Sequence, residues 1–182
     1  MNRLIAVFVL IFITPILLIV SLFIIIEDGF PIFFKQKRVG ENYSFFMIYK
    51  FRSMKKNTPN VATHLLTNPE QYLLKTGKII RKLSFDELPN LINIIKGEMV
   101  FVGPRPALYN QDDLMTLRVA TGVDKLKPGI TGWAQINGRD EISIEVKVAL
   151  EQEYLKRKSF LFDSYIIIKT FTNVLFSKGV NH

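Results

Sequence analysis

The sequence predicts an α+β protein that is mainly helical, with a small β-hairpin and an N-terminal membrane helix. Leu4 to Ile26 is an unbroken apolar run, two β-prone segments flank Gly40-Glu41-Asn42, and amphipathic stretches follow residue 70. The chain has 182 residues, which is room for one modest domain, and its 48% apolar content is high for a soluble one. We therefore expect residues 1–28 to form the membrane segment. Residues 29–182 are expected to form a compact domain at the membrane interface.

The apolar run has about the length that a membrane-crossing helix needs. Pro15 lies at its middle, where it removes a backbone hydrogen bond and favours a kink or a break. The helix either crosses the bilayer with a kink or enters and leaves by the same face as two half-helices. Arg3 precedes the run and Lys35 follows it, and cations beside membrane segments tend to stay cytoplasmic. We favour the re-entrant form, with Thr14-Pro15 at the break and the Thr14 hydroxyl bonded to a freed carbonyl.

The remaining elements follow from periodicity and from turn residues. Ile32 to Phe34 and Ser44 to Phe51 predict a hairpin, and Met99 to Val102 predicts a short strand. Helices are expected over Tyr72 to Leu83, Glu87 to Lys96, Ile142 to Lys158 and Phe160 to Phe176, whereas Lys55 to Glu70 and Asp124 to Arg139 are predicted to be loops. Gly97 is expected to cap the second helix. The basic first helix fits an anionic membrane surface or a solvated face equally well, and the charged last helix fits an interfacial or buried position better than a second crossing.

Composition limits the possible chemistry. Lys and Arg outnumber Asp and Glu by 24 to 16, which favours anionic partners such as lipid headgroups, lipid phosphates, nucleotides or nucleic acid. The chain has no cysteine, and its two histidines are His64 and the final residue, His182, so Cys/His zinc sites and thiol catalysis are excluded. Carboxylates, hydroxyls, lysines or a divalent ion must supply any acid, base or nucleophile.

Asp86-Glu87 is one of four adjacent carboxylate pairs, and its context distinguishes it. The pair follows the basic helix and opens the next one, with Pro89 in the first turn. The helix dipole and exposed N–H groups would hold a carboxylate there ionised, ready to attack phosphorus or to bind Mg²⁺. Ser84 and Glu87 also match a capping box, in which the acidic residue serves helix stability alone. The local pattern leaves both interpretations open.

Gly103-Pro104-Arg105-Pro106 places one arginine between two prolines. A stiff backbone that presets a guanidinium fork suits two-point phosphate binding, although a surface turn with a solvated arginine has the same pattern. Lys50, Arg52 and Arg139 are further candidates, each of which alone fits a salt bridge or a lipid contact.

Longer motifs resemble one known family. They are Leu83-Ser84-Phe85-Asp86-Glu87-Leu88-Pro89-Asn90-Leu91, Lys96-Gly97-Glu98-Met99, Gly103-Pro104-Arg105-Pro106, Lys127-Pro128-Gly129-Ile130-Thr131-Gly132, Gln135-Ile136-Asn137-Gly138-Arg139 and Tyr49-Lys50-Phe51-Arg52-Ser53-Met54. In this order, and with the Pro15-broken run before them, they closely resemble the bacterial sugar transferases called monotopic phosphoglycosyl transferases. The chain resembles the small form of that family, which has the catalytic core alone.

The resemblance implies a re-entrant membrane helix and a catalytic core on the cytoplasmic face of the bacterial inner membrane. It implies that Asp86 attacks a UDP-sugar, releases UMP and passes the sugar phosphate to polyprenyl phosphate, such as undecaprenyl phosphate, with Glu87 assisting and Mg²⁺ held by both. The basic positions that it implies for substrate binding are Lys50, Arg81, Arg105 and Arg139. Anionic membrane lipids are further partners, a homodimer is open, and nucleic acid is not expected. The product would initiate a surface polysaccharide or glycan, and the sequence does not specify the sugar.

Two other classes compete with an enzyme. A nucleic-acid binder fits the basic charge and the aromatic content, but the apolar run counts against it. A membrane-anchored basic scaffold without an active site would keep the apolar run and leave Asp86 and Arg105 without a chemical role.

Overall fold

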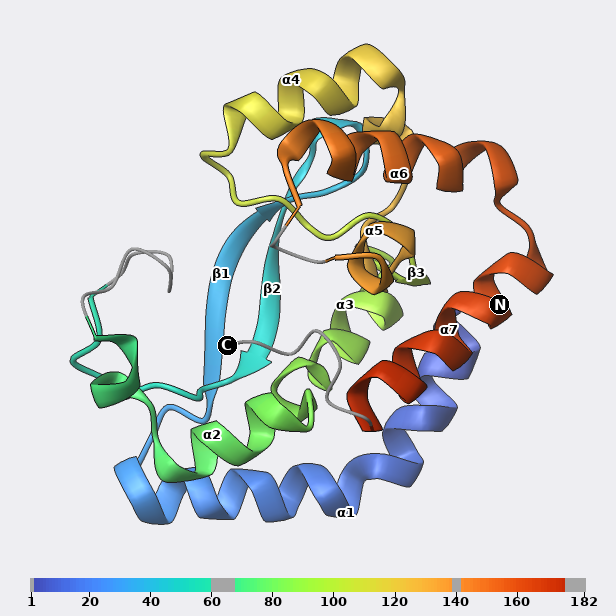
Figure 1. The fold of residues 1–182 in the computed structure, drawn as a ribbon. Helices are drawn as coiled ribbons and strands as arrows, with labels where there is room; N and C mark the ends of the chain where they lie inside the picture. The colour runs from blue at the N-terminus through green and yellow to red at the C-terminus, as the bar shows by residue number, and fades with distance from the viewer. Residues whose placement is uncertain (1, 60–67, 139–141, 176–182) are drawn as a thin grey trace.

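The longest element is α1 (Asn2–Asp28), a continuous helix with Pro15 inside it. We describe a computed structural model, which covers residues 2–59, 68–138 and 142–175. Figure 1 shows α1 along the lower edge of the molecule, with a change of direction near its middle. Within the described residues α1 is the one helix long and apolar enough to cross a membrane. A kink is therefore present, but the two separate half-helices of a re-entrant hairpin are not seen.

Thr14 differs in detail from expectation. Its hydroxyl donates to the carbonyl of Leu10 at 2.7 Å. Proline leaves the carbonyl four residues earlier without its donor, and for Pro15 this is Ile11. The expected bond from Thr14 to the freed carbonyl is therefore wrong by one residue, and the hydroxyl reinforces the preceding helical turn instead.

The elements after α1 alternate short strands with helices around a β-hairpin (Figure 1). In chain order they are β1 (Phe33–Val39), η1 (Glu41–Tyr43), β2 (Phe45–Phe51), η3 (Pro69–Tyr72), α2 (Lys75–Lys82), η4 (Phe85–Glu87), α3 (Asn90–Lys96), β3 (Val100–Val102), α4 (Asp112–Thr121), η5 (Val123–Lys125), β4 (Gly129–Thr131), α5 (Trp133–Ile136), α6 (Ile144–Arg157) and α7 (Phe160–Leu175). The mainly helical class with a small hairpin is confirmed.

The hairpin positions the site. β1 and β2 pair antiparallel from Phe33 opposite Phe51 to Val39 opposite Phe45, which confirms the hairpin predicted around Gly40. The first strand extends to Val39, beyond the predicted Ile32 to Phe34. A second, parallel pair joins β3 to β4, and the sequence did not reveal it. The segment predicted as a loop from Asp124 to Arg139 contains β4 and α5, so that prediction was wrong over residues 129–136.

Both halves of α1 contribute to the core of the domain. Ala6 is fully buried with Leu91 and Ile94 of α3, and Ile24 is fully buried with Leu74 and Ile80 near α2. The rest of the helix surface is apolar and exposed. Its exposed large side chains are Leu4, Ile5, Val7, Phe8, Ile11, Phe12, Ile16, Leu18, Ile19, Leu22, Phe23 and Ile26. One stripe of α1 therefore belongs to the domain, and the remainder presents hydrocarbon outward.

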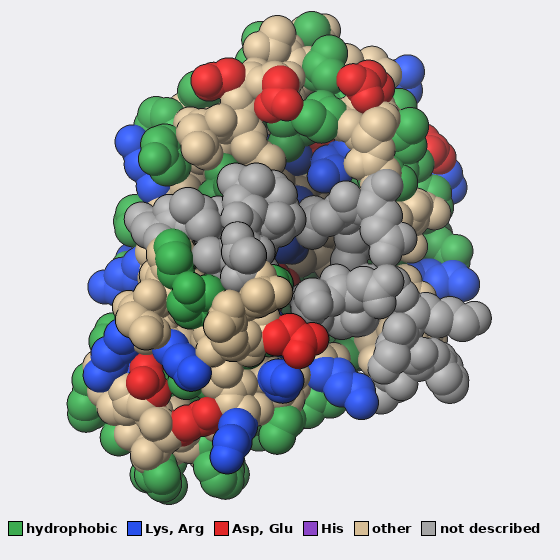
Figure 2. All heavy atoms as spheres, turned by 60° about the vertical axis from the view of Figure 1, so that its left-hand side comes forward, with side chains coloured by type: hydrophobic (Ala, Val, Ile, Leu, Met, Phe, Trp, Pro, Cys, Tyr) green, Lys and Arg blue, Asp and Glu red, His purple; other side chains and the backbone are tan. Residues whose placement is uncertain are grey.

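Helix α2 lies close above α1. A side chain on Gly77 would meet the carbonyl oxygen of Ser53 at 2.0 Å, so glycine permits the close approach of α2 to the segment that follows β2. The outer face of α2 carries exposed Lys75, Lys78 and Lys82 beside exposed Ile79. Figure 2 shows the same arrangement on one face of the molecule, with apolar side chains along the lower edge and Lys and Arg side chains just above it.

Helices α4 and α6 cover the top of the molecule in Figure 1, and α7 returns toward β3 and β4. The sequence did not reveal α4. α7 buries Phe162 and Ile166, and its Asp163 accepts a hydrogen bond of 2.8 Å from Tyr154. The same helix exposes Phe160, Leu161, Tyr165, Ile168 and Phe171. α7 is thus half buried and half apolar surface, as its mixed sequence predicted.

Candidate active site

The hairpin supplies two cations to one pocket. Residues opposite each other on paired strands share a sheet face, as do alternate residues of one strand. Arg38 lies opposite Phe46, and Lys50 lies four residues after Phe46, so both cations project from the same face. Both line the pocket, together with Ile48 between them.

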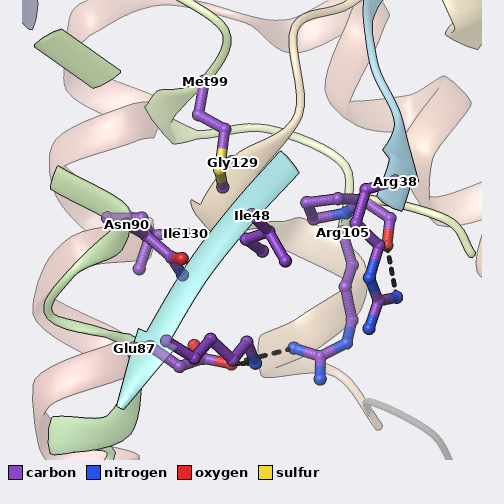
Figure 3. Close-up of a pocket in the computed structure, with 10 residues that line it drawn as sticks. Arg38, Ile48, Glu87, Asn90, Met99, Arg105, Gly129 and Ile130 are labelled. Atoms are coloured by element: carbon purple, nitrogen blue, oxygen red, sulfur yellow. Dashed lines mark hydrogen bonds and ion pairs between the residues drawn. The ribbon is translucent and has the colours of Figure 1, made fainter. Parts of the chain in front are cut away.

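Glu87 is the acidic centre of this pocket. Its Oε1 accepts a hydrogen bond of 2.6 Å from Lys50 Nζ, and Arg105 Nη1 lies 3.5 Å from the same oxygen. Glu87 comes from η4, Lys50 from β2 and Arg105 from the loop after β3, so three segments distant in sequence meet at one carboxylate (Figure 3). The meeting of these three predicted site residues is the central geometric finding.

Asp86 precedes Glu87 in the same turn and is half-buried. Burial raises the pKa of Asp86 to about 6, the neighbouring Glu87 charge adds to the rise, and Lys50 and Arg81 oppose it. The sequence predicted a carboxylate held ionised by a helix end. That reason was wrong, because Asp86 and Glu87 form their own 3-10 turn and α3 begins only at Asn90. At neutral pH a carboxyl with this pKa is still mainly ionised.

The capping box is also absent. Ser84 adopts a left-handed conformation at φ 55°, and its side chain makes no capping hydrogen bond. Glu87 turns instead toward Lys50 and Arg105. The acidic pair therefore has no capping role at the start of α3, which removes the main structural alternative for these residues.

The loop that carries Arg105 is clamped to the neighbouring strand. Gly103 N–H donates to Thr131 at 2.9 Å, and Gly129 N–H donates to the carbonyl of Pro104 at 2.9 Å. A side chain on Gly103 would meet the carbonyl oxygen of Lys127 at 2.4 Å. The glycine permits this close backbone contact. The contact fixes the backbone position from which the Arg105 side chain extends.

A buried ion pair supports the same loop from behind. Arg118 of α4 and Glu151 of α6 pair at 2.5 and 2.8 Å, and both are almost fully buried. Arg118 Nη2 also donates to the carbonyl oxygen of Arg105 at 2.9 Å. The backbone of Arg105 is thus held on two sides, by β4 and by α4.

The pocket has a polar and an apolar side. Its lining residues are Arg38, Ile48, Lys50, Glu87, Asn90, Met99, Arg105, Pro106, Gly129 and Ile130. Figure 3 shows Asn90 on one side and Arg38 and Arg105 on the other, with Glu87 at the lower end. In Figure 2, Lys and Arg side chains lie at the bottom of a hollow between the upper and lower parts of this face. The hollow suits a molecule with negative charge and a less charged remainder.

The other predicted residues have different positions. Arg81 does not line the pocket. Its Nε donates to Ser53 Oγ at 2.8 Å, and burial lowers the pKa of its guanidinium, an effect that Asp86 opposes. Arg139 lies outside the described residues, and Thr14 and Pro15 belong to α1.

Two pocket residues, Arg38 and Asn90, escaped the sequence analysis as site candidates. The observed pairing places Arg38 on the same face as Lys50, and a register assigned to the hairpin from the sequence could have found it. Asn90 had no such signal, because an asparagine at the start of a helix is common.

The carboxylate pair fits the Mg²⁺ that the family resemblance implies. Within the described ranges no group of three or more His, Asp or Glu side chains forms an all-protein metal site. Mg²⁺ commonly uses one or two carboxylates and completes its shell with water and substrate phosphates. Burial and the neighbouring Glu87 charge raise the pKa of Asp86, and a divalent cation held by the two carboxylates would offset both effects.

Comparison with known proteins identifies the class. The family model described as bacterial sugar transferase matches residues 1–177, so the chain belongs to this family and is a transferase. The expected family is confirmed.

Individual relatives extend the match over most of the chain. The uncharacterized sugar transferase EpsL of Bacillus subtilis (strain 168) is 43% identical over 175 residues, covering 96% of this chain and 85% of EpsL. The exopolysaccharide production protein ExoY of Sinorhizobium fredii is 36% identical, covering 97% of this chain and 84% of ExoY. The UDP-glucose:undecaprenyl-phosphate glucose-1-phosphate transferase of Escherichia coli K12 is 35% identical over 91% of this chain, and the match spans 37% of that longer protein.

Proposed function

We propose that this protein transfers a sugar phosphate from a UDP-sugar to undecaprenyl phosphate and so begins the assembly of a surface polysaccharide or glycan. The observation that carries the proposal is the half-buried Asp86 carboxylate beside Glu87, with Lys50, Arg81 and Arg105 around the pair. An anionic nucleophile among cations is what transfer of a phosphoryl group requires. The Escherichia coli relative, whose name states such a reaction with UDP-glucose, supports the choice of substrates.

In the first step the Asp86 carboxylate attacks the β-phosphorus of the UDP-sugar. An Asp86 oxygen–phosphorus bond forms, the bond from phosphorus to the bridging oxygen breaks, and UMP leaves with that oxygen. Lys50 and Arg105 neutralise the charge that develops on the phosphoryl oxygens, the principal electrostatic task in this reaction. Glu87 keeps both cations directed at the pocket through its Oε1 contacts.

In the second step an oxygen of undecaprenyl phosphate attacks the phosphorus carried by Asp86. The new phosphorus–oxygen bond completes a diphosphate, and the Asp86 carboxylate leaves in its original state. We place the entry of the acceptor phosphate beside the lysines of α2 and near Arg81. Both steps conserve charge and atoms without an oxidant or a reductant.

Asp86 and Glu87 would hold Mg²⁺, which when bound neutralises diphosphate charge and favours UMP as a leaving group. A binding measurement can test this separately from activity. We expect Mg²⁺ to raise the melting temperature of the wild-type protein at pH 7.5 and to have less effect on Asp86→Asn.

The membrane arrangement that we propose keeps both ends of α1 on the cytoplasmic face of the inner membrane. Ala6 and Ile24 both pack against the same domain, although about 27 Å of helix separates them at 1.5 Å per residue. A helix that crossed the bilayer upright would carry one of these contacts far from a domain on the other side. The exposed lysines of α2 then lie at the level of anionic headgroups.

Intact-protein mass spectrometry tests the covalent step. Incubation with Mg²⁺ and the correct UDP-sugar, without lipid acceptor, is expected to add one sugar phosphate to the wild-type protein and nothing to Asp86→Asn. Asp112→Asn is the matched control, because Asp112 also belongs to an adjacent carboxylate pair but lies exposed in the first turn of α4. A mass increase on Asp86→Asn would refute Asp86 as the nucleophile, and a wild-type protein inactive with every UDP-sugar would favour a scaffold instead.

A further inference from the structure

Asn90 stands out among the pocket residues. It is 2% exposed, it lines the pocket, and its side-chain Oδ1 has no hydrogen-bond partner in the described part of the chain. Burying an acceptor without a donor costs free energy, so such atoms in a folded protein call for an explanation.

Asn93, one turn later in α3, shows that this helix can satisfy a buried asparagine. Its Nδ2 donates to Met47 at 2.8 Å and to Glu98 at 2.7 Å, and its Oδ1 accepts from Tyr49 N–H at 3.2 Å. Asn93 is 0% exposed and binds the hairpin to α3. Asn90 is nearly as buried, its Oδ1 has no partner among the described residues, and it lines the pocket instead (Figure 3).

The surroundings of Asn90 indicate what kind of group would reach it. Across the pocket from Asn90, Arg38 and Arg105 provide positive charge. Other parts of the wall are apolar and consist of Ile48, Met99 and Ile130. The charged side suits a diphosphate, and the apolar side suits a neutral group with a few hydrogen-bond donors. A carbonyl oxygen such as Oδ1 requires a partner with an O–H or N–H group.

The two substrates differ in whether they can offer such a donor. A polyprenyl phosphate has acceptor oxygens and a hydrocarbon chain. A sugar ring carries hydroxyls and, in the N-acetyl sugars, an amide N–H, and it is joined directly to the phosphorus that Asp86 attacks. A phosphate held by Lys50 and Arg105 therefore places the ring within the same pocket.

We propose that Asn90 determines sugar specificity, with its amide oxygen accepting a hydrogen bond from a hydroxyl or acetamido N–H of the donor sugar. The inference rests on the proposed function, since it assigns a role within the same site. A site that hydrogen-bonds one particular group rejects analogues that lack it, because its buried polar atom is then left unpaired.

The test measures UMP release from UDP-glucose, UDP-galactose, UDP-N-acetylglucosamine and UDP-N-acetylgalactosamine with undecaprenyl phosphate in excess. For Asn90→Ala we expect kcat/KM for the preferred sugar to fall about 10-fold to 100-fold, and its preference over the other sugars to shrink. The KM for undecaprenyl phosphate should stay unchanged. Asn90→Ser, which keeps a smaller acceptor, should retain part of the preference and provides a second variant if alanine prevents folding.

Asn93→Ala is the matched control. It removes satisfied hydrogen bonds, so we expect a lower melting temperature with an unchanged ranking of sugars. Asn90→Ala should melt at or above the wild-type temperature, because it removes an unpaired buried acceptor. Unchanged kcat/KM ratios among the sugars in Asn90→Ala, with an active wild-type protein, would overturn the Asn90 inference alone. A wild-type protein that releases no UMP from any of these donors would instead overturn the proposed function.

Discussion

Arg118 and Glu151 form a buried bidentate ion pair, and Arg118 extends that pair to the backbone of Arg105. The pair lies between α4 and α6, away from the pocket lining, yet it contacts the loop that presents a pocket cation. The stability of the upper part of the molecule and the position of Arg105 therefore depend on the same guanidinium.

Glu151→Ala is expected to destabilise the protein by about 3–5 kcal/mol, because it leaves Arg118 charged, buried and unpaired. Denaturant unfolding in detergent micelles measures this loss. Glu70→Ala is the matched control, since Glu70 pairs with Lys78 at 3.8 Å on the surface and should contribute at most about 1 kcal/mol. If both substitutions lowered the free energy of unfolding by the same amount, the buried pair would contribute no more to stability than the surface pair.

Asp86→Asn is expected to raise stability at pH 7.5 in EDTA, because it removes a half-buried charge beside Glu87. The pKa of Asp86 is raised to about 6 from 3.8, so the folded protein binds the proton more tightly than the unfolded chain. Wild-type stability should therefore gain, relative to Asp86→Asn, as the pH falls from about 7 toward 4, by up to roughly 1.4 kcal/mol per unit. Melting curves of both proteins across this range check the sign. A relative gain on raising the pH would contradict the assigned shift.

Arg105→Lys is expected to lose most activity although the charge remains. Pro104 and Pro106 fix the loop, and an ammonium cannot reproduce two parallel hydrogen bonds to a phosphate. Loss of one charge-assisted hydrogen bond, roughly 1.5–3 kcal/mol, corresponds to about one to two orders of magnitude in turnover. Arg157→Lys, at an exposed site on α6, serves as the control. Near-normal turnover of Arg105→Lys beside an inactive Arg105→Ala would mean that charge alone matters there.

Arg3 and Lys35 are expected to face the same side of the membrane. The Arg3 guanidinium lies against Gly97 at the end of α3, and Lys35 belongs to the hairpin, so both contact the same domain. Because the chain has no cysteine, single cysteines at these positions can be labelled from either side of sealed vesicles. Labelling from opposite sides would establish a crossing helix.

The sequence predicted those elements whose structure depends on neighbouring residues. The hairpin followed from two β-prone segments around Gly40, and the end of α3 at Gly97, with φ 84°, followed from the preference of glycine for left-handed backbone. The pairing of β3 with β4 did not, because two three-residue strands carry almost no periodic signal and their register is set by the backbone contact of Gly103 with Gly129. Helix α4 escaped because its buried face includes a charged residue, Arg118.

The site divides in the same way. Asp86, Glu87, Lys50 and Arg105 were found from charge and motif, and the structure brings the last three into contact. The burial of Asp86 and the unpaired oxygen of Asn90 depend on packing between distant segments, so no reading of neighbouring residues could have revealed them.

Helix α1 has two apolar faces with different surroundings. One stripe packs into the interior of the domain, and the rest of the surface is exposed and suited to hydrocarbon. A chain that began at residue 29 would lack Ala6 and Ile24 and would leave Leu91, Ile94 and Ile80 without their covering layer. Removal of α1 would therefore expose core side chains of the domain and take away its longest apolar surface in one step.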